Sequence, residues 1–257
     1  MRTTMQAIKE HKARLLQEYP EDRVLGVFCY GSQNYHIDTP NSDVDTKAIL
    51  IPTIEDMCLK DVVSRELHLD NGEHCEVKDI REYARMIKKQ NINFIEILFT
   101  DYCWINPKYN SLWRKYFVNN AELLSKMDVR RGGISMLCQA INTLNKIPLN
   151  QGNFGKGYAN ALRIYHSFKR LEAGENYKDA IDMSFDPELC EFLIDCKQNK
   201  KIPTREDIYI LSGLLQTMRE RLDASEQKPN EEAVAALDNA VVALITSDKK
   251  NFDFYKN

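Results

Sequence analysis

The sequence lacks any apolar run that approaches the roughly 18 residues of a transmembrane helix. Its beginning at Met1 is polar and contains no apolar segment of the kind found in secretion signals. Internal repeats and low-complexity tracts are also missing. These absences exclude a membrane-spanning or repetitive architecture, so we expect a soluble protein with no membrane partner.

Cysteine is present but lacks the spacing that would give it a structural role. The seven cysteines are odd in number and scattered, and none of them forms a C-x-x-C motif. This pattern argues against a disulfide framework and against a zinc ribbon. None of the five histidines lies at metal-ligand spacing from a cysteine. We therefore expect a reducing compartment, and the cytoplasm fits best.

The chain also lacks an excess of positive charge. It has 35 Lys and Arg residues against 38 Asp and Glu residues, for a net charge of -3. A whole-protein basic field of the kind that drives non-specific nucleic-acid binding is excluded, so an RNA partner would need a local patch. With 257 residues, 43% of them hydrophobic, the chain can bury a core, and its length suits one large domain or two modest ones.

The stretch from Val24 to Pro52 carries the strongest functional signal. An apolar run from Val24 to Cys29 predicts a buried strand, and a second strand is predicted from Asp43 to Ile51. Side chains two residues apart in a strand point to the same face, so Asp43 and Asp45 are expected to project together. Neighbouring carboxylates repel unless a cation lies between them, and Mg²⁺ or Mn²⁺ suits such oxygen ligands.

The turn between these strands contains Gly31 and Ser32. Glycine lets the backbone approach a phosphate closely, and backbone N–H groups at an expected helix start can bind phosphate oxygens together with the Ser32 hydroxyl. A metal site beside a phosphate-binding turn predicts that the protein holds a nucleoside triphosphate by its phosphates.

Two motifs in this stretch point to a known family. The chain contains YGSQNY at residues 30–35 and SDVDTKAI at residues 42–49. Together they resemble the signature of the DNA polymerase β-like nucleotidyltransferase superfamily, and in particular its predicted RNA-repair-associated branch of bacteria and phages. The match runs from about Val24 to Thr100, with a weaker similarity from Lys156 to Arg170.

The resemblance implies a reaction. A nucleoside monophosphate would pass from an NTP to an acceptor hydroxyl with release of pyrophosphate, and Mg²⁺ or Mn²⁺ would be required. The resemblance to the RNA-repair-associated branch implies an RNA 3′ end as the acceptor. A protein hydroxyl and a small molecule are the alternative acceptors. A catalytically silent nucleotide-binding module and a two-metal phosphodiesterase are the alternatives.

Enzymes of this superfamily use a third carboxylate, and two residues compete for that role. Glu76 lies between two apolar neighbours in a predicted strand, so its side chain points away from them, as a site residue would. Asp79 begins an Asp-x-x-Glu sequence ahead of an apolar-periodic helix, which is typical of a helix cap. We select Glu76, with Asp43 and Asp45, as the metal-binding and catalytic set.

Two lysines are expected close to these carboxylates. Lys47 would share a strand face with Asp43 and Asp45, and Lys78 would share one with Glu76. Either could neutralise phosphate or carboxylate charge, although a solvated lysine is the commoner case.

A basic stripe follows one face of the helix expected from Lys156 to Glu172. It contains Lys156, Asn160 and Arg163 at helical spacing. The side chains of such a stripe usually just face solvent. In enzymes of the superfamily, however, the helical lobe closes over the nucleotide, so the resemblance implies that these three residues contact it.

A further helix is expected from Gln90 to Phe99, where nearly continuous apolar residues indicate burial under the sheet. Asn93 is the expected cap. Glu96 lies inside this helix, and we expect it to satisfy a backbone group or a basic partner.

The order of elements indicates an α+β fold. Strand patterns end before Leu112, and helical patterns then continue to Thr246. The resemblance implies that residues 1–110 form a nucleotidyltransferase lobe with a mixed, mostly antiparallel sheet, and that residues 111–257 form an all-helical lobe. The active site is expected in the cleft between the two.

Overall fold

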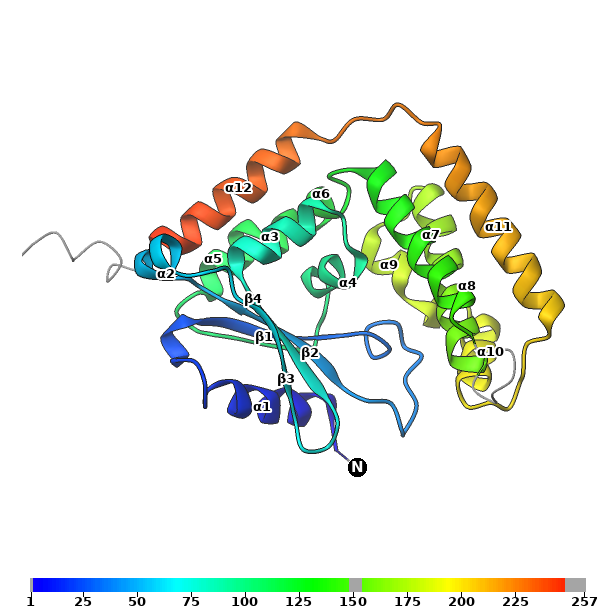
Figure 1. Ribbon diagram of the computed structural model, residues 1–257, viewed down its shortest axis with the longest axis horizontal. Coiled ribbons are helices and arrows are strands. Elements are labelled where there is room, and N and C mark those ends of the chain that lie inside the picture. The colour runs from blue at the N-terminus through cyan, green and yellow to red at the C-terminus, as the bar shows by residue number, and fades with distance from the viewer. Residues whose placement is uncertain (1, 148–153, 248–257) are drawn as a thin grey trace, which may run out of the picture.

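One five-stranded sheet forms the centre of the N-terminal half (Figure 1). The structure is a computed structural model that describes residues 2–147 and 154–247. In the order β3-β4-β2-β1-β5, the sheet comprises β1 (Val24–Tyr30), β2 (Asp45–Leu50), β3 (Ser64–His68), β4 (His74–Asp79) and β5 (Cys103–Ile105). Strands β2 and β4 are parallel and the other neighbouring pairs are antiparallel, so the predicted mixed, mostly antiparallel sheet is confirmed.

Helix α1 (Thr4–Leu15) covers one face of this sheet (Figure 1). The helix begins where the Thr3 hydroxyl accepts a hydrogen bond from the Gln6 N–H at 3.2 Å. Its Ile8 and Leu15 side chains are buried in one cluster with apolar residues of β1, β2 and β4. The predicted helix on the outside of the sheet is thereby confirmed.

The opposite face carries α3 (Ile80–Lys88), α4 (Ile92–Ile95) and the 3-10 turn η2 (Glu96–Leu98). Aromatic rings connect this layer to the sheet through Trp113, whose ring centroid lies 6.1 Å from that of Tyr83 in α3 and 4.9 Å from that of Phe28 in β1. Residues 92–98 are nearly all buried, which confirms the predicted placement of this segment under the sheet.

Most of the remaining described chain is helical. The further α-helices are α2 (Ile54–Leu59), α5 (Asn110–Tyr116), α6 (Ala121–Ser125), α7 (Val129–Asn145), α8 (Phe154–Glu172), α9 (Tyr177–Ile181), α10 (Pro187–Lys197), α11 (Arg205–Asp223) and α12 (Glu231–Thr246). Helices α10 and α7 pack on α8, α11 packs on α7, and α12 returns over α3, α5 and α6 (Figure 1). The α+β class is confirmed. Across the described residues, no helix has the length and apolar character needed to cross a membrane.

The helices on the face opposite α1 share one apolar core with the sheet, and α1 is buried in a separate cluster on the other face. The expected boundary at residue 110 coincides with the start of α5, whose Trp113 belongs to the same buried cluster as Phe28 of β1. The helical half is therefore packed directly onto the sheet face opposite α1.

Some local predictions differ from the structure. The cap of α4 is Asn91, whose side chain accepts a hydrogen bond from the Asn93 N–H at 3.1 Å, so the predicted cap at Asn93 is wrong. The three-residue strand β5 has no counterpart among the predicted strands. Asp79, by contrast, caps α3 as predicted, because its carboxylate accepts from the Arg81 and Glu82 N–H groups at 2.8 and 3.3 Å.

Candidate functional site

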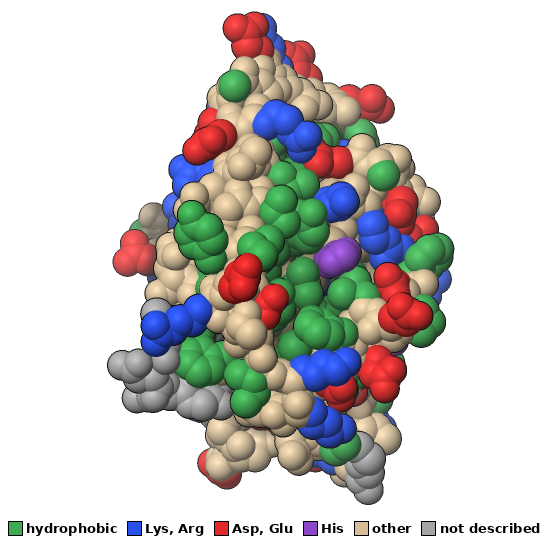
Figure 2. All heavy atoms as spheres, turned by 90° about the vertical axis from the view of Figure 1, so that its right-hand side faces the viewer, with side chains coloured by type: hydrophobic (Ala, Val, Ile, Leu, Met, Phe, Trp, Pro, Cys, Tyr) green, Lys and Arg blue, Asp and Glu red, His purple; other side chains and the backbone are tan. Residues whose placement is uncertain are grey.

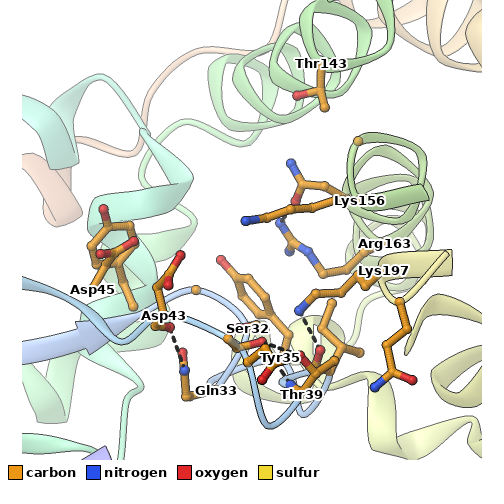
Figure 3. A pocket seen from close by; sticks show the side chains of 18 of the residues that line it. Ser32, Gln33, Tyr35, Thr39, Asp43, Asp45, Thr143, Lys156, Arg163 and Lys197 are labelled. Atoms are coloured by element: carbon orange, nitrogen blue, oxygen red, sulfur yellow. Dashed lines mark hydrogen bonds between the residues drawn. The ribbon is translucent and has the colours of Figure 1, made fainter. Parts of the chain in front are cut away.

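A cavity of about 910 Å³ lies where the end of β1 meets the helical half (Figure 3). Most of the predicted site residues line it, namely Gly31, Ser32, Asp43, Asp45, Lys156, Asn160 and Arg163. Figure 3 shows the two aspartates on one side, and Lys156, Arg163 and Lys197 on the other. The structure thus brings an acidic side and a basic side together in one cavity.

The acidic side forms where the chain enters β2. Asp45 is the first residue of the strand and Asp43 lies in the loop before it, so the predicted strand start at Asp43 is two residues too early. Burial raises the pKa of Asp45, the charge of Asp43 adds to this rise, and His74 opposes it. Because the charges of Asp43 and Asp45 disfavour each other, a cation bound between the two carboxylates would be stabilising.

His74 contacts Asp45 from the neighbouring strand. The parallel register, in which Thr46 pairs with Cys75, places these two side chains next to each other. The Nδ1 atom of His74 lies 2.9 Å from Asp45 Oδ1, and its Nε2 lies 3.0 Å from the Tyr30 hydroxyl oxygen. His74 was not predicted, because its place beside Asp45 depends on the register of two strands that are distant in sequence.

The turn after β1 contains Gly31, which has a φ of 97°. Only glycine adopts this conformation without strain. Residues 32–36 form turns, so the predicted helix start is wrong. The Gly31 N–H donates to Glu96 Oε1 at 2.7 Å, and contact with a ligand at this turn therefore falls mainly to Ser32, which lines the cavity.

Glu96 is buried beneath this turn. Its contact with Gly31 confirms the prediction that it satisfies a backbone group. Burial raises the pKa of the Glu96 carboxyl to about 8, although the charge of Arg163 and the Gly31 N–H both oppose the rise. Glu96 is therefore linked to the turn by a hydrogen bond, and its ionised form is favoured by the charge of Arg163 in α8.

Arg163 of α8 is only 3% exposed, which excludes a solvated role for it. Its guanidinium carbon lies 3.7 Å from the centroid of the Tyr35 ring, and its Nη2 donates to Asn160 Oδ1 at 2.9 Å. Burial lowers the pKa of Arg163 to about 10 despite the opposing effect of Glu96, so the side chain is still charged at neutral pH. Lys156, in contrast, is exposed at the cavity.

Lys197 is a cavity residue that was not predicted. It is the last residue of α10, and its Nζ donates to the Ile37 carbonyl oxygen at 2.6 Å. Burial lowers the pKa of Lys197 to about 8, Lys156 and Arg163 lower it as well, and Asp38 opposes them. A lysine at the end of an amphipathic helix has no sequence signal that distinguishes it from a solvated one.

The loop between β1 and β2 is held against the helical half by polar contacts. The Tyr35 carbonyl oxygen accepts a hydrogen bond from the Met183 N–H at 3.1 Å, and His36 Nδ1 lies 2.8 Å from Asp182 Oδ1. These contacts hold the segment that connects the glycine-serine turn to the acidic side. The helices therefore help to position the site as well as to line it.

Glu76 and Lys47 are not among the residues that line the cavity. They form an ion pair across β2 and β4, on the same sheet face as Asp45 and away from the α1 layer, as predicted. Glu76 also contacts Lys78 Nζ at 3.0 Å, and although burial favours a higher pKa for Glu76, the two lysines outweigh it and lower the pKa. Lys47 is 2% exposed, with its Nζ 3.8 Å from the Tyr30 ring centroid.

The acidic side fits a divalent cation that arrives with a phosphate. Among residues 2–147 and 154–247, no three His, Cys, Asp or Glu side chains are grouped as metal ligands. Mg²⁺ is, however, commonly held by one or two carboxylates together with substrate phosphates. Asp43 and Asp45 supply such a pair in the same cavity as Ser32. For a metal to bind, Asp45 would have to exchange its contact with His74, and Glu76 would have to exchange its lysine partners.

Comparison of the chain with models of known protein families gives no match, and a search of curated proteins also gives none. The resemblance to the polymerase β-like superfamily, carried by residues 30–35 and 42–49, is therefore still a prediction. The geometry of the cavity and these two motifs are the grounds for assigning a function.

Proposed function

We propose that this protein is a metal-dependent nucleotidyltransferase. The observation that supports this best is that Asp43 and Asp45 lie across one cavity from Lys156, Arg163 and Lys197 (Figure 3). A metal-bound NTP has the complementary pattern, since its phosphates need cations and its metal needs carboxylates. The cavity volume of about 910 Å³ also lies in the range of about 300–1,000 Å³ that is usual for small-molecule sites.

Asp43 and Asp45 are proposed to bind Mg²⁺ or Mn²⁺, and Glu76 to complete the second metal position. The metal would neutralise phosphate charge and lower the pKa of the acceptor hydroxyl. Lys47 is buried against Glu76, and we propose that it orients the Glu76 carboxylate and does not contact a phosphate.

Ser32 and the backbone of the Gly31 turn are proposed to hold the β and γ phosphates, and Lys156, Asn160 and Arg163 to contact the nucleotide. With the triphosphate held in this way, the acceptor oxygen attacks the α phosphorus in line with the leaving group. A bond forms between the acceptor oxygen and the α phosphorus, and the bond from that phosphorus to the bridging oxygen breaks. Pyrophosphate leaves, and the proton of the acceptor hydroxyl passes to solvent or to a carboxylate.

The proposed acceptor is an RNA 3′ end, with a protein hydroxyl or a small molecule as the other choices. Figure 2 shows the face that bears α11, where Lys and Arg side chains are mixed with Asp and Glu. Among the described side chains of that face, no single basic track stands out. Together with the net charge of -3, this favours local contacts near the cavity for an RNA over a broad electrostatic surface on this face.

The proposal is tested by incubating the protein with radiolabelled NTPs, Mg²⁺ and total RNA. We expect transfer of label with release of pyrophosphate, and loss of both in Asp43→Ala/Asp45→Ala. Asp61→Asn is the matched control, because Asp61 is an exposed carboxylate that does not line the cavity. Failure to label any RNA, protein or small-molecule acceptor would overturn the proposal.

A catalytically silent nucleotide-binding module is the second candidate. It is favoured by the engagement of Glu76 with Lys47 and Lys78, which leaves no preassembled set of three carboxylates in the described chain. Nucleotide binding without transfer would identify such a module. Release of nucleoside monophosphates from RNA would instead identify a two-metal phosphodiesterase.

A further inference from the structure

Four cations line the cavity, and one of them, Lys200, forms an ion pair with Asp195 at 3.8 Å. The other three gather on the helical side, namely Lys156 and Arg163 of α8 and Lys197 of α10 (Figure 3). They come from two helices that pack against each other. Their charges act on one another, because Lys156 and Arg163 both disfavour the charged form of Lys197. Like charges that line one cavity repel each other in the unliganded protein, and a bound anion would remove that repulsion.

Within the described chain, none of these three cations forms an ion pair with a carboxylate. Arg163 donates one N–H to Asn160 at 2.9 Å, and Lys197 donates one to the Ile37 carbonyl oxygen at 2.6 Å. Arginine has five N–H donors and a protonated lysine has three, so both side chains retain donors for a ligand. Glu96 and Asp38 act on Arg163 and Lys197 only from beyond ion-pair distance. The cluster therefore retains hydrogen-bonding capacity that its protein neighbours do not use.

We propose that Lys156, Arg163 and Lys197 form a binding site for a phosphate group. A phosphate offers several strong acceptor oxygens to a planar guanidinium and two ammonium groups, and these are the side chains that bind it best. This assignment adds Lys197, which no motif indicated, and it places a phosphate on the helical side of the cavity as well as at Ser32. It rests on the proposed function only for the identity of the molecule that carries the phosphate.

The site itself is tested with inorganic tripolyphosphate in the absence of metal, by titration calorimetry at low salt and neutral pH. We expect the wild-type protein to bind, and Lys197→Gln and Lys156→Gln each to weaken binding by about tenfold, the effect of losing one charge-assisted hydrogen bond. Lys197→Arg should keep most of the affinity, because it keeps the charge.

The matched control is Lys169→Gln, which removes an exposed cation from the same helix but from outside the cavity. Its affinity for tripolyphosphate should equal that of the wild type. Lys156 is exposed, so Lys156→Gln remains informative even if the Lys197 variant is poorly folded. Equal affinities in the wild type, Lys156→Gln and the Lys169→Gln control, or no binding by the wild type, would overturn the site.

Two molecules could bring the phosphate, the NTP or a polynucleotide acceptor. A fall in the affinity of Lys197→Gln for an NTP alone would assign the site to the triphosphate. A fall in its affinity for a 5′-hydroxyl oligoribonucleotide alone would assign it to a backbone phosphate of the acceptor. Unchanged affinity for both would overturn the role of the site in substrate binding.

This test separates the phosphate site from the proposed activity. A protein that binds tripolyphosphate through Lys197 but transfers no label to any acceptor would keep the phosphate site and lose the nucleotidyltransferase assignment. A protein that transfers label, but binds tripolyphosphate equally well without Lys197 or Lys156, would lose the phosphate site and keep the nucleotidyltransferase assignment.

Discussion

The Glu96 carboxylate accepts a hydrogen bond from the Gly31 N–H at 2.7 Å. This contact joins the buried η2 turn beneath the sheet to the turn that leads into the cavity. Gly31 has a φ of 97°, a conformation that glycine adopts readily. The hydrogen bond to Glu96 stabilises the backbone in this conformation. Glu96 thus fixes the backbone that precedes Ser32 while remaining outside the cavity itself.

Glu96→Gln should make the protein more stable than the wild type as the pH rises. The pKa of Glu96 in the folded protein is about 8, against a usual 4.5, so between these values the folded protein holds a proton that the unfolded chain has lost. Wild-type stability therefore falls as the pH rises through this range. Gln keeps an acceptor oxygen and does not titrate, so its advantage should reach on the order of 3 kcal/mol above about pH 8.

Urea unfolding of both proteins near pH 5 and near pH 9 measures this effect. Glu10→Gln, which changes an exposed carboxylate on α1, serves as the control and should follow the wild type. A constant difference between Glu96→Gln and the wild type across the pH range would contradict the raised pKa.

Gly31→Ala should destabilise the protein and weaken nucleotide binding. An added Cβ meets no atom within 4 Å, so the penalty comes from the positive φ and not from a clash. That conformation costs a non-glycine residue about 1–2 kcal/mol, and relaxation of the turn would displace Ser32. Gly213→Ala in α11 is the control, since it also has open space but a helical backbone, and should be neutral or slightly stabilising. Equal melting temperatures for the two variants would contradict this account.

Asp43→Asn should abolish transfer and hardly change stability. Asp43 lies in a loop, and its negative charge raises the pKa of Asp45. Removing the charge of Asp43 therefore relieves a repulsion between the two side chains in the metal-free protein. As a proposed metal ligand, Asp43 should contribute at least about a hundredfold to the rate of transfer. Label transfer and thermal unfolding are measured side by side. A large fall in melting temperature with activity intact would show that the residue is structural.

The local patterns of the sequence predicted much of the sheet and its two layers. Alternating polarity around Glu76 identified β4 and the face on which Glu76 lies, and the Asp-x-x-Glu sequence at Asp79 identified the start of α3. These features depend on near neighbours in the chain, which is why a single sequence is enough to find them.

The features that were missed depend on long-range packing. The three-residue strand β5 exists because it pairs with the edge of β1, and His74 meets Asp45 because β4 lies parallel to β2. Lys197 enters the cavity because α10 packs on α8. None of these relationships has a periodic signature, so they follow only from the folded arrangement.

Glu76→Gln should lower both stability and activity, and a second substitution should separate the two effects. Lys47 is 2% exposed, so loss of the Glu76 charge leaves a buried cation with no anionic partner. The cost should be about 3 kcal/mol, the lower end for a broken buried ion pair, because the Glu76 side chain is 20% exposed. In Lys47→Met/Glu76→Gln the buried charge is gone, and the apolar chain can pack against the Tyr30 and Phe94 rings. The double variant should therefore regain most of the lost stability.

Label transfer by the stable double variant then decides the role of Glu76. If Glu76 completes the metal site, transfer stays low even though folding has recovered, and the Mn²⁺ concentration needed for half-maximal activity rises. Transfer by the double variant is compared with that of Lys47→Met alone, which also lacks the lysine that orients Glu76 but keeps Glu76 beside Lys78. Wild-type transfer in the double variant would remove Glu76 from the metal site and leave Asp43 and Asp45 as its protein ligands.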